Sequence, residues 1–114
     1  MGELCAIFAK TPKRNKNKKR VVIITCGPFP AHVAEYDFIK EEITFTGSFV
    51  PEPVDESSIV DTNGAGDAFA GGFLSQYVRK QPLPQCMHAG HWAASLIIQT
   101  RGCEIPDNLA YEEM

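Results

Sequence analysis

The sequence lacks the features of a membrane-spanning or secreted protein. It has no apolar run near the length of about 20 residues that a transmembrane helix needs, so we expect no membrane span. No leading basic stretch precedes an apolar segment at its start, so we expect no secretory signal. No Cys-x-x-Cys pair occurs, which favours free thiols in a reducing compartment over a zinc site. The cysteines are Cys5, Cys26, Cys86 and Cys103.

The chain also has little net charge. The formal value of −3 over 114 residues gives no general attraction to nucleic acid. Hydrophobic residues make up 44% of the chain, which is enough for a packed core, so we do not expect the whole chain to be disordered. The length allows at most one domain, and no internal repeat divides it.

One segment departs from this balance, the basic run Lys-Arg-Asn-Lys-Asn-Lys-Lys-Arg at residues 13–20. A solvated loop before a strand explains such a run, and a nuclear-localisation patch or a nucleic-acid-binding arm are the alternatives. No aromatic residue interleaves the basic side chains, which argues against stacking on bases. We therefore expect no nucleic-acid partner and a cytoplasmic location, with a nuclear location as the alternative.

The N-terminal half predicts a short helix followed by three strands. Residues 4–10 have helical spacing of their apolar side chains. Residues 21–24 form a continuous β-branched apolar run, which predicts a strand buried on both faces. Residues 33–39 and 43–49 alternate apolar and polar side chains, and the charged residues between them predict a turn. These last two strands are therefore expected to form an antiparallel hairpin.

The C-terminal half predicts two helices, at residues 65–79 and 85–100, with Gly102 ending the second. The aromatic side chains of the first helix that the spacing turns toward the core are Phe69, Phe73 and Tyr77. Gly71 and Gly72 weaken this helix, because glycine has a poor helix propensity. We expect the pair to serve close packing against a neighbouring element.

The segment that leads into the first of these helices is Asp61-Thr62-Asn63-Gly64-Ala65-Gly66-Asp67. Its two glycines place free backbone N–H groups at a helix N-terminus, where the helix dipole favours anions. Asp67 lies at the start of the same helix, close to any anion bound there. A carboxylate beside an anion site suits phosphoryl transfer, because it can orient a hydroxyl group and accept its proton.

This segment and the Ala-Phe-Ala-Gly-Gly-Phe that follows it resemble the second signature of the ribokinase-like (PfkB) family of carbohydrate and nucleoside kinases. Residues 20–27 and 89–95 extend the resemblance over most of the chain. It implies an α/β fold, the C-terminal part of a ribokinase-like three-layer sandwich in which helices flank a mixed sheet. Residues 1–114 would then form a single incomplete domain, the last third of such a kinase, without the family's Asn-x-x-Glu motif.

Within the family, the sequence is most similar to nucleoside kinases, which implies ATP-dependent phosphorylation of a nucleoside 5′-hydroxyl. Adenosine is the expected acceptor and AMP the expected product, as in purine salvage, with Mg²⁺ screening the phosphates of ATP. The complete protein is expected to be a monomer, and the 114 residues alone to be inactive. The alternatives are a sugar kinase of the same family and a non-catalytic truncated relative that binds a partner.

The resemblance also assigns roles within the motif. Asp67 would be the catalytic base, and its alternative role is to stabilise the helix start through the helix dipole. The backbone N–H groups of Gly64, Ala65 and Gly66 would form the anion hole, where a β-carbon on either glycine would crowd the phosphate or forbid a positive φ. Asp61 and Thr62 would orient the loop by capping or hold a metal-bound water.

Four further residues are candidates for binding nucleotide or substrate. Asn63 would line the nucleoside and phosphate path, and its alternative is a simple turn residue. His91 would lie beside the adenine of ATP, and its alternative is a helix-face histidine bonded to a backbone carbonyl. Thr25 and Gly27 match the family's Thr-x-Gly near the nucleotide phosphates, although the proline after Gly27 has no N–H to offer. We expect no residue here to ligate a metal directly.

Overall fold

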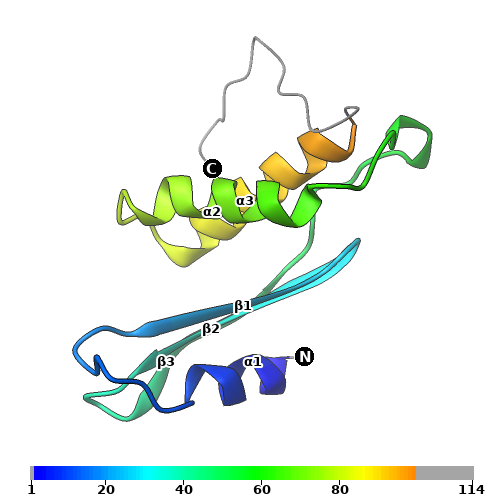
Figure 1. The fold of residues 1–114 in the computed structure, drawn as a ribbon. Helices are drawn as coiled ribbons and strands as arrows, with labels where there is room; N and C mark the ends of the chain where they lie inside the picture. Colours follow the sequence, from blue (N-terminus) through cyan, green and yellow to red (C-terminus); the bar gives the residue numbers. More distant parts are fainter. Residues whose placement is uncertain (1, 100–114) are drawn as a thin grey trace. The chain divides into compact units, whose positions relative to one another are not determined.

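The computed structural model describes residues 2–99, and the chain divides into two compact units at the bond between Val50 and Pro51. The first unit contains α1 (Gly2–Ala9), β1 (Arg20–Cys26), β2 (Phe29–Asp37) and β3 (Glu42–Phe49). The second contains the 3₁₀ turn η1 (Glu56–Ser58), α2 (Ala65–Tyr77) and α3 (Leu83–Ile98) (Figure 1). The α/β class predicted from the sequence is confirmed.

The three strands form one antiparallel sheet in the order β1-β2-β3. The predicted hairpin is confirmed, although β2 begins at Phe29 and so is longer at its start than expected. The longer strand arises because Gly27 and Pro28 make a tight turn that lets β2 pair with β1 directly. All described pairings are antiparallel, so the parallel pairing of a mixed sheet would have to involve strands outside residues 2–99.

The expectation that residues 21–24 are buried on both faces is wrong for the described part of the chain. All four are half-buried, and no residue of β1 is fully buried. The physical reason is that β1 is an edge strand there, hydrogen-bonded to β2 alone among the described strands. A continuous apolar run therefore identified the strand correctly and overstated its burial.

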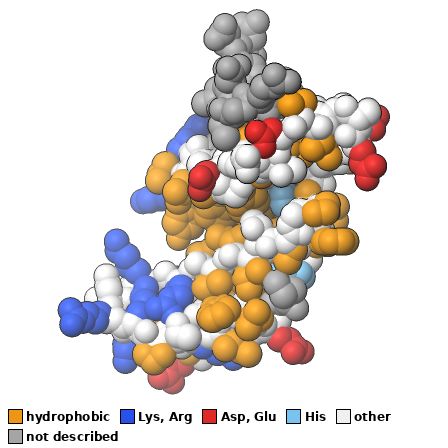
Figure 2. Space-filling model, turned by 45° about the vertical axis from the view of Figure 1, so that its right-hand side comes forward, with side chains coloured by type: hydrophobic (Ala, Val, Ile, Leu, Met, Phe, Trp, Pro, Cys, Tyr) orange, Lys and Arg blue, Asp and Glu red, His pale blue; other side chains and the backbone are white. Residues whose placement is uncertain are grey.

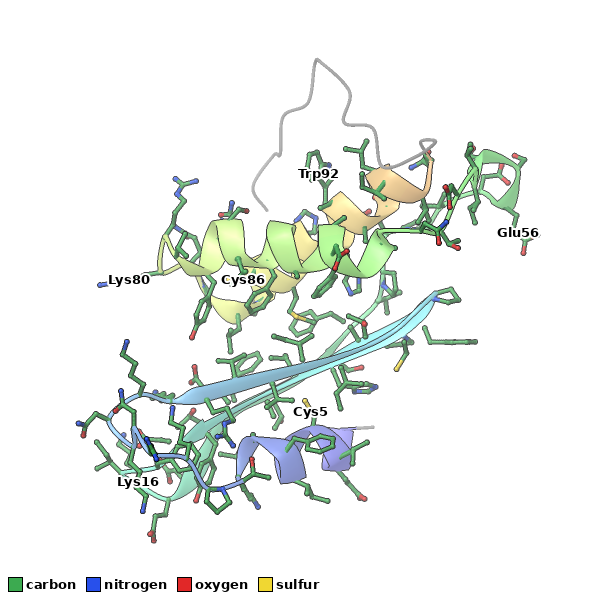
Figure 3. The ribbon with its side chains drawn as sticks, in the orientation of Figure 1. Cys5, Lys16, Glu56, Lys80, Cys86 and Trp92 are labelled. Carbon is green, nitrogen blue, oxygen red and sulfur yellow. The ribbon has the colours of Figure 1, made fainter. Side chains whose placement is uncertain are left out.

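Helix α1 packs on the sheet through its small residues. Cys5 and Ala9 are fully buried and form a cluster with Ala34 of β2. The Cys5 side chain points toward the sheet, where its thiol donates a hydrogen bond to the carbonyl of Val22 at 3.0 Å (Figure 3). Small side chains allow this close approach, and the large apolar residues lie on the exposed face of the helix. These are Leu4, Ile7 and Phe8.

The basic run is a loop up to Arg20, which begins β1, and two of its cations lie over the ring of Phe38, in the turn that follows β2. Lys13 Nζ and the Arg20 guanidinium lie 5.2 Å and 5.4 Å from the centre of the Phe38 ring. Arg20 also donates hydrogen bonds to the carbonyls of Phe8 and Thr11, at the end of α1. The other lysine and arginine side chains gather at one end of this unit, open to solvent (Figure 2).

In the second unit, α2 and α3 lie side by side (Figure 1). Phe69 and Phe73 are buried as predicted, with relative exposures of 6% and 5%. Tyr77 stacks on Phe73 but is 41% exposed, because α2 ends at this residue, two residues earlier than expected. The prediction that Tyr77 is a core residue is therefore wrong here, and Gly102 lies outside the described residues.

Gly71 and Gly72 turn out to differ. A β-carbon built on Gly72 would overlap the carbonyl oxygen of Ala89 and lie 2.9 Å from the Ala93 Cβ, so α2 and α3 touch at this point. A β-carbon on Gly71 would meet no atom within 4 Å. The predicted use of the pair in close packing is confirmed for Gly72 and wrong for Gly71.

Candidate phosphate-binding site

The chain is anchored to α3 just before it enters the motif. The backbone N–H groups of Val60 and Asp61 both donate to the carbonyl oxygen of Ile98, at 2.8 Å and 3.1 Å. Ile98 is the last residue of α3, where the carbonyl groups have no partner within the helix. The end of one helix therefore fixes the approach to the start of the other.

The conformation of the loop is set by a hydrogen bond to Asp61 and by the left-handed backbone of Gly64. The Asp61 carboxylate accepts a hydrogen bond from the Asn63 N–H at 2.9 Å, which closes a tight turn. Gly64 follows with φ 82° and ψ 0°, a left-handed conformation that a residue with a β-carbon adopts only with strain. Its carbonyl accepts the first bond of α2, from the Ala68 N–H at 2.9 Å. The positive φ predicted as one reason for glycine is thus found at Gly64.

The first turn of α2 leaves backbone donors open. The Ala65 N–H makes only a long bond of 3.4 Å to the Thr62 carbonyl. Among the described residues, the N–H groups of Gly66 and Asp67 have no acceptor, and no side chain caps the helix. These amides sit at the positive end of the helix dipole, which is the arrangement that binds anions.

Unlike Gly64, Gly66 is required neither by backbone geometry nor by packing. Its φ is not positive, and a β-carbon built on it would meet nothing within 4 Å. Glycine in a helix costs about 1 kcal/mol relative to alanine. The structure therefore shows open space beside this amide and no packing reason for the missing side chain.

Asp67 lies in the first turn of α2, exposed to solvent. Within residues 2–99 its carboxylate makes no hydrogen bond or ion pair, in contrast to the carboxylate of Asp61. A negative charge here interacts favourably with the helix dipole. The same carboxylate is free to accept a hydrogen bond from a molecule bound over the open amides.

His91 faces the other helix rather than solvent. It is 7% exposed, and its ring meets the ring of Phe69 edge-on, with centroids 5.0 Å apart and planes 71° apart. This contact joins His91 of α3 to Phe69, which lies two residues after the motif in α2. The predicted contact between His91 and the adenine of ATP stays a prediction.

Thr25 and Gly27 lie in the first unit, at the turn between β1 and β2. Thr25 is exposed beside an irregularity in the strand pairing, and Gly27 has a φ of 56°. A glycine with positive φ at the first central position is typical of two-residue hairpin turns. Gly27 thus has a structural role, and the predicted binding of nucleotide phosphates by these two residues stays a prediction.

Sequence reasoning missed two features of the site. One is the anchoring of residues 60–61 by the Ile98 carbonyl, which leaves no mark in the sequence because only backbone atoms take part. The other is the contact of Phe69 with Gly90 of α3, where a β-carbon would lie 2.8 Å from the ring. A glycine within a helical stripe was the available signal for this second contact.

Residues 6–109 match the family described as pfkB family carbohydrate kinase. The chain is 38% identical over 100 residues to adenosine kinase 2 of Arabidopsis thaliana. The matched region covers 88% of this chain and 27% of that relative. It is also similar to the structure of Anopheles gambiae adenosine kinase in complex with P1,P4-di(adenosine-5) tetraphosphate. That likeness has a TM-score of 0.75 and 40% identity over 89% of this chain and 28% of the other.

The structure of Schistosoma mansoni adenosine kinase in complex with 2-fluoroadenosine gives a TM-score of 0.72, with 36% identity over 92% of this chain and 29% of that one. The chain thus spans just over a quarter of the length of the relatives that it matches. No helix among residues 2–99 is long and apolar enough to cross a bilayer. The family match includes α2, α3 and all three strands, and the chain belongs to the PfkB family of carbohydrate kinases.

Proposed function

We propose that this chain forms the phosphate-binding and proton-accepting part of a kinase that transfers the γ-phosphoryl group of ATP to the 5′-hydroxyl of adenosine. One observation carries the proposal: the open amides of Gly66 and Asp67 lie at the start of α2 beside the exposed carboxylate of Asp67. The relatives named above are adenosine kinases, which favours adenosine as the acceptor. The products are AMP and ADP.

In the proposed reaction, the amides at the start of α2 hold the transferring phosphoryl group through its oxygens. The 5′-oxygen of adenosine attacks the γ-phosphorus while the bond from phosphorus to the bridging oxygen of ADP breaks. Asp67 orients the hydroxyl group and accepts its proton, which leaves late because an alcohol is barely acidic at neutral pH. The open space beside Gly66 leaves room for the phosphoryl oxygens.

The donor enters this scheme as the Mg²⁺ complex of ATP. Among the described residues, no group of three or more histidine, cysteine, aspartate or glutamate side chains could hold a metal. Mg²⁺ is usually held by substrate phosphates, water and one or two carboxylates, so a site built from protein side chains alone is not needed.

The remaining candidates take secondary roles in the proposal. Asn63 lines the path of nucleoside and phosphate, next to the turn that Asp61 closes. His91 borders the adenine of ATP, and Thr25 and Gly27 approach its phosphates. A relative that binds di(adenosine-5) tetraphosphate, which joins two adenosine groups through four phosphates, supports a donor and an acceptor that both carry adenosine.

The test uses the complete protein that carries this chain, incubated with MgATP and either adenosine, ribose or fructose. The proposal expects AMP and ADP to form in equal amounts with adenosine. Phosphorylation of a sugar with none of adenosine would replace it with the sugar kinase alternative. No phosphorylation of any acceptor, by a folded protein, would favour the non-catalytic alternative.

A further inference from the structure

We propose that Gly90 of α3 is a positioning residue for Asp67. By having no side chain, Gly90 lets the ring of Phe69 lie directly on α3, and this contact fixes the first turn of α2. The consequence for reaction rate rests on the proposed function, while the contact and its effect on the helix do not. Neither the family match nor the names of the relatives assign this role to Gly90.

The contact is close and specific. A β-carbon built on Gly90 would lie 2.8 Å from Cε2, 2.9 Å from Cδ2 and 2.9 Å from Cζ of the Phe69 ring. Real β-carbons essentially never approach other atoms so closely. Any residue other than glycine at position 90 must therefore displace the Phe69 ring.

Phe69 has little freedom to move aside. The Phe69 side chain is 6% exposed. Its ring centroid lies 5.0 Å from that of His91, in an edge-on contact, and 6.4 Å from that of Phe73. A ring enclosed in this way resists a change of rotamer, because interiors are close-packed. We infer that a side chain at position 90 would push the backbone of α2, rather than only the ring.

Asp67 lies two residues before Phe69 on the same helix. A shift of the Phe69 backbone therefore reaches the Asp67 carboxylate and the open amides of the first turn together. A misplacement of about 1 Å in a catalytic group can cost about 100-fold in rate. The position of Gly90 thus bears on catalysis even though Gly90 belongs to the other helix.

Backbone geometry does not explain this glycine. Among the described glycines only Gly27 and Gly64 have positive φ, so Gly90 adopts a conformation open to any residue. Glycine also weakens a helix relative to alanine. The close contact with Phe69 is the physical reason for a glycine at this position of α3.

The upstream end of the motif depends on α3 as well. The Ile98 carbonyl accepts hydrogen bonds from the N–H groups of Val60 and Asp61. Helix α3 therefore holds both flanks of the loop, through Ile98 on one side and Gly90 on the other. With both flanks fixed, a displacement of α2 at Phe69 cannot be absorbed by a shift of the whole loop.

The experiment compares Gly90→Ala with Gly71→Ala in the complete protein. Gly71 also lies within a helix, but a β-carbon there meets no atom within 4 Å, so it controls for the general effect of replacing a helical glycine. Hydrogen exchange is measured on the amides of residues 64–70, and steady-state kinetics are measured with adenosine. A third variant, Gly90→Ala with Phe69→Leu, makes room for the added methyl group.

We expect Gly90→Ala to speed exchange at the Ala68 and Phe69 amides and to lower kcat about 10- to 100-fold. The KM for adenosine should stay within about twofold, since the loss is in the transition state. Gly71→Ala should not speed exchange at these amides and should leave kcat unchanged. The double variant should regain part of the kcat that Gly90→Ala loses.

Unchanged exchange in Gly90→Ala would overturn the inference, whatever the activity of the protein. Equal acceleration in Gly71→Ala would overturn it as well, because the effect would then come from any helical glycine. If exchange responds as expected but the unmodified protein phosphorylates no adenosine, the contact stands and the proposed function fails. If the protein is active and Gly90→Ala keeps its kcat, the positioning role fails alone.

Discussion

The carboxylate of Asp61 accepts a hydrogen bond from the backbone N–H of Asn63 at 2.9 Å. This bond commits one of the two motif aspartates to the shape of the loop. The other, Asp67, is exposed and has no partner within the described residues. The two carboxylates thus divide into one that shapes the loop, which is one of the two roles expected of Asp61, and one that is open to a substrate.

Asp61→Asn is expected to keep most of the activity of the complete protein, whereas Asp61→Ala is expected to lose much more. The amide oxygen of asparagine can still accept the Asn63 N–H, and alanine cannot. Steady-state kinetics on both variants measure this. Equal losses in the two would show that the charge of Asp61, rather than its hydrogen bond, is what the site uses, as the alternative of a metal-bound water requires.

Gly66→Ala is expected to fold normally and to lose activity. The structure has room for the methyl group, and alanine should favour the helix by about 1 kcal/mol. The bound phosphoryl group would meet the same methyl group, so the KM for ATP should rise or kcat should fall. Thermal unfolding and kinetics are measured together. A variant as active as the unmodified protein would remove Gly66 from the anion hole.

Gly72→Ala is expected to lower the free energy of unfolding, by about 1–3 kcal/mol. Its methyl group would overlap the Ala89 carbonyl, and α2 and α3 would have to separate. Gly71→Ala is the matched control and should raise stability slightly, since it gains helix propensity without a clash. Chemical denaturation of both variants checks this, and equal changes in the two would show that the packing at Gly72 is not close.

The stability of the hairpin between β2 and β3 should fall at acid pH through Asp37. The Lys40 N–H bonds its carboxylate and, with the Ile39 N–H and nearby lysines, holds the pKa of Asp37 below its ordinary value of 3.8. A carboxyl whose pKa is lower in the folded state stabilises the fold above the unfolded pKa. This stabilisation is lost as the pH falls through the folded pKa.

In Asp37→Asn this part of the acid dependence should disappear. Hydrogen exchange at the amides of residues 39–40, followed as a function of pH, measures it in the hairpin itself. Identical pH profiles in the variant and the unmodified protein would show that Asp37 does not couple the turn to pH.

The sequence predicted the order of the elements and the motif because both depend on local chemistry. The alternation of residues 43–49 and the run at residues 21–24 mark strands regardless of their surroundings. The left-handed Gly64 likewise follows from the turn that it occupies. Such features need no knowledge of what lies nearby.

Burial and helix contacts could not be predicted in the same way. The half-burial of β1 depends on which strands pair with it, and the difference between Gly71 and Gly72 depends on the rotation of α2 against α3. The Ile98 carbonyl has no sequence signal at all, since any residue offers the same backbone oxygen. These properties belong to tertiary packing, which periodicity alone does not specify.

The most direct test of the account is kcat for Asp67→Asn in the complete protein, with Glu56→Gln as control. Glu56 is an exposed acid of η1, at the far end of the loop that leads into the motif (Figure 3). Asparagine keeps the size of Asp67 but cannot accept the proton, so kcat should fall about 10²- to 10⁴-fold while KM changes little. Glu56→Gln should leave kcat unchanged. A kcat for Asp67→Asn within about threefold of the unmodified protein would contradict the role of Asp67 as the catalytic base.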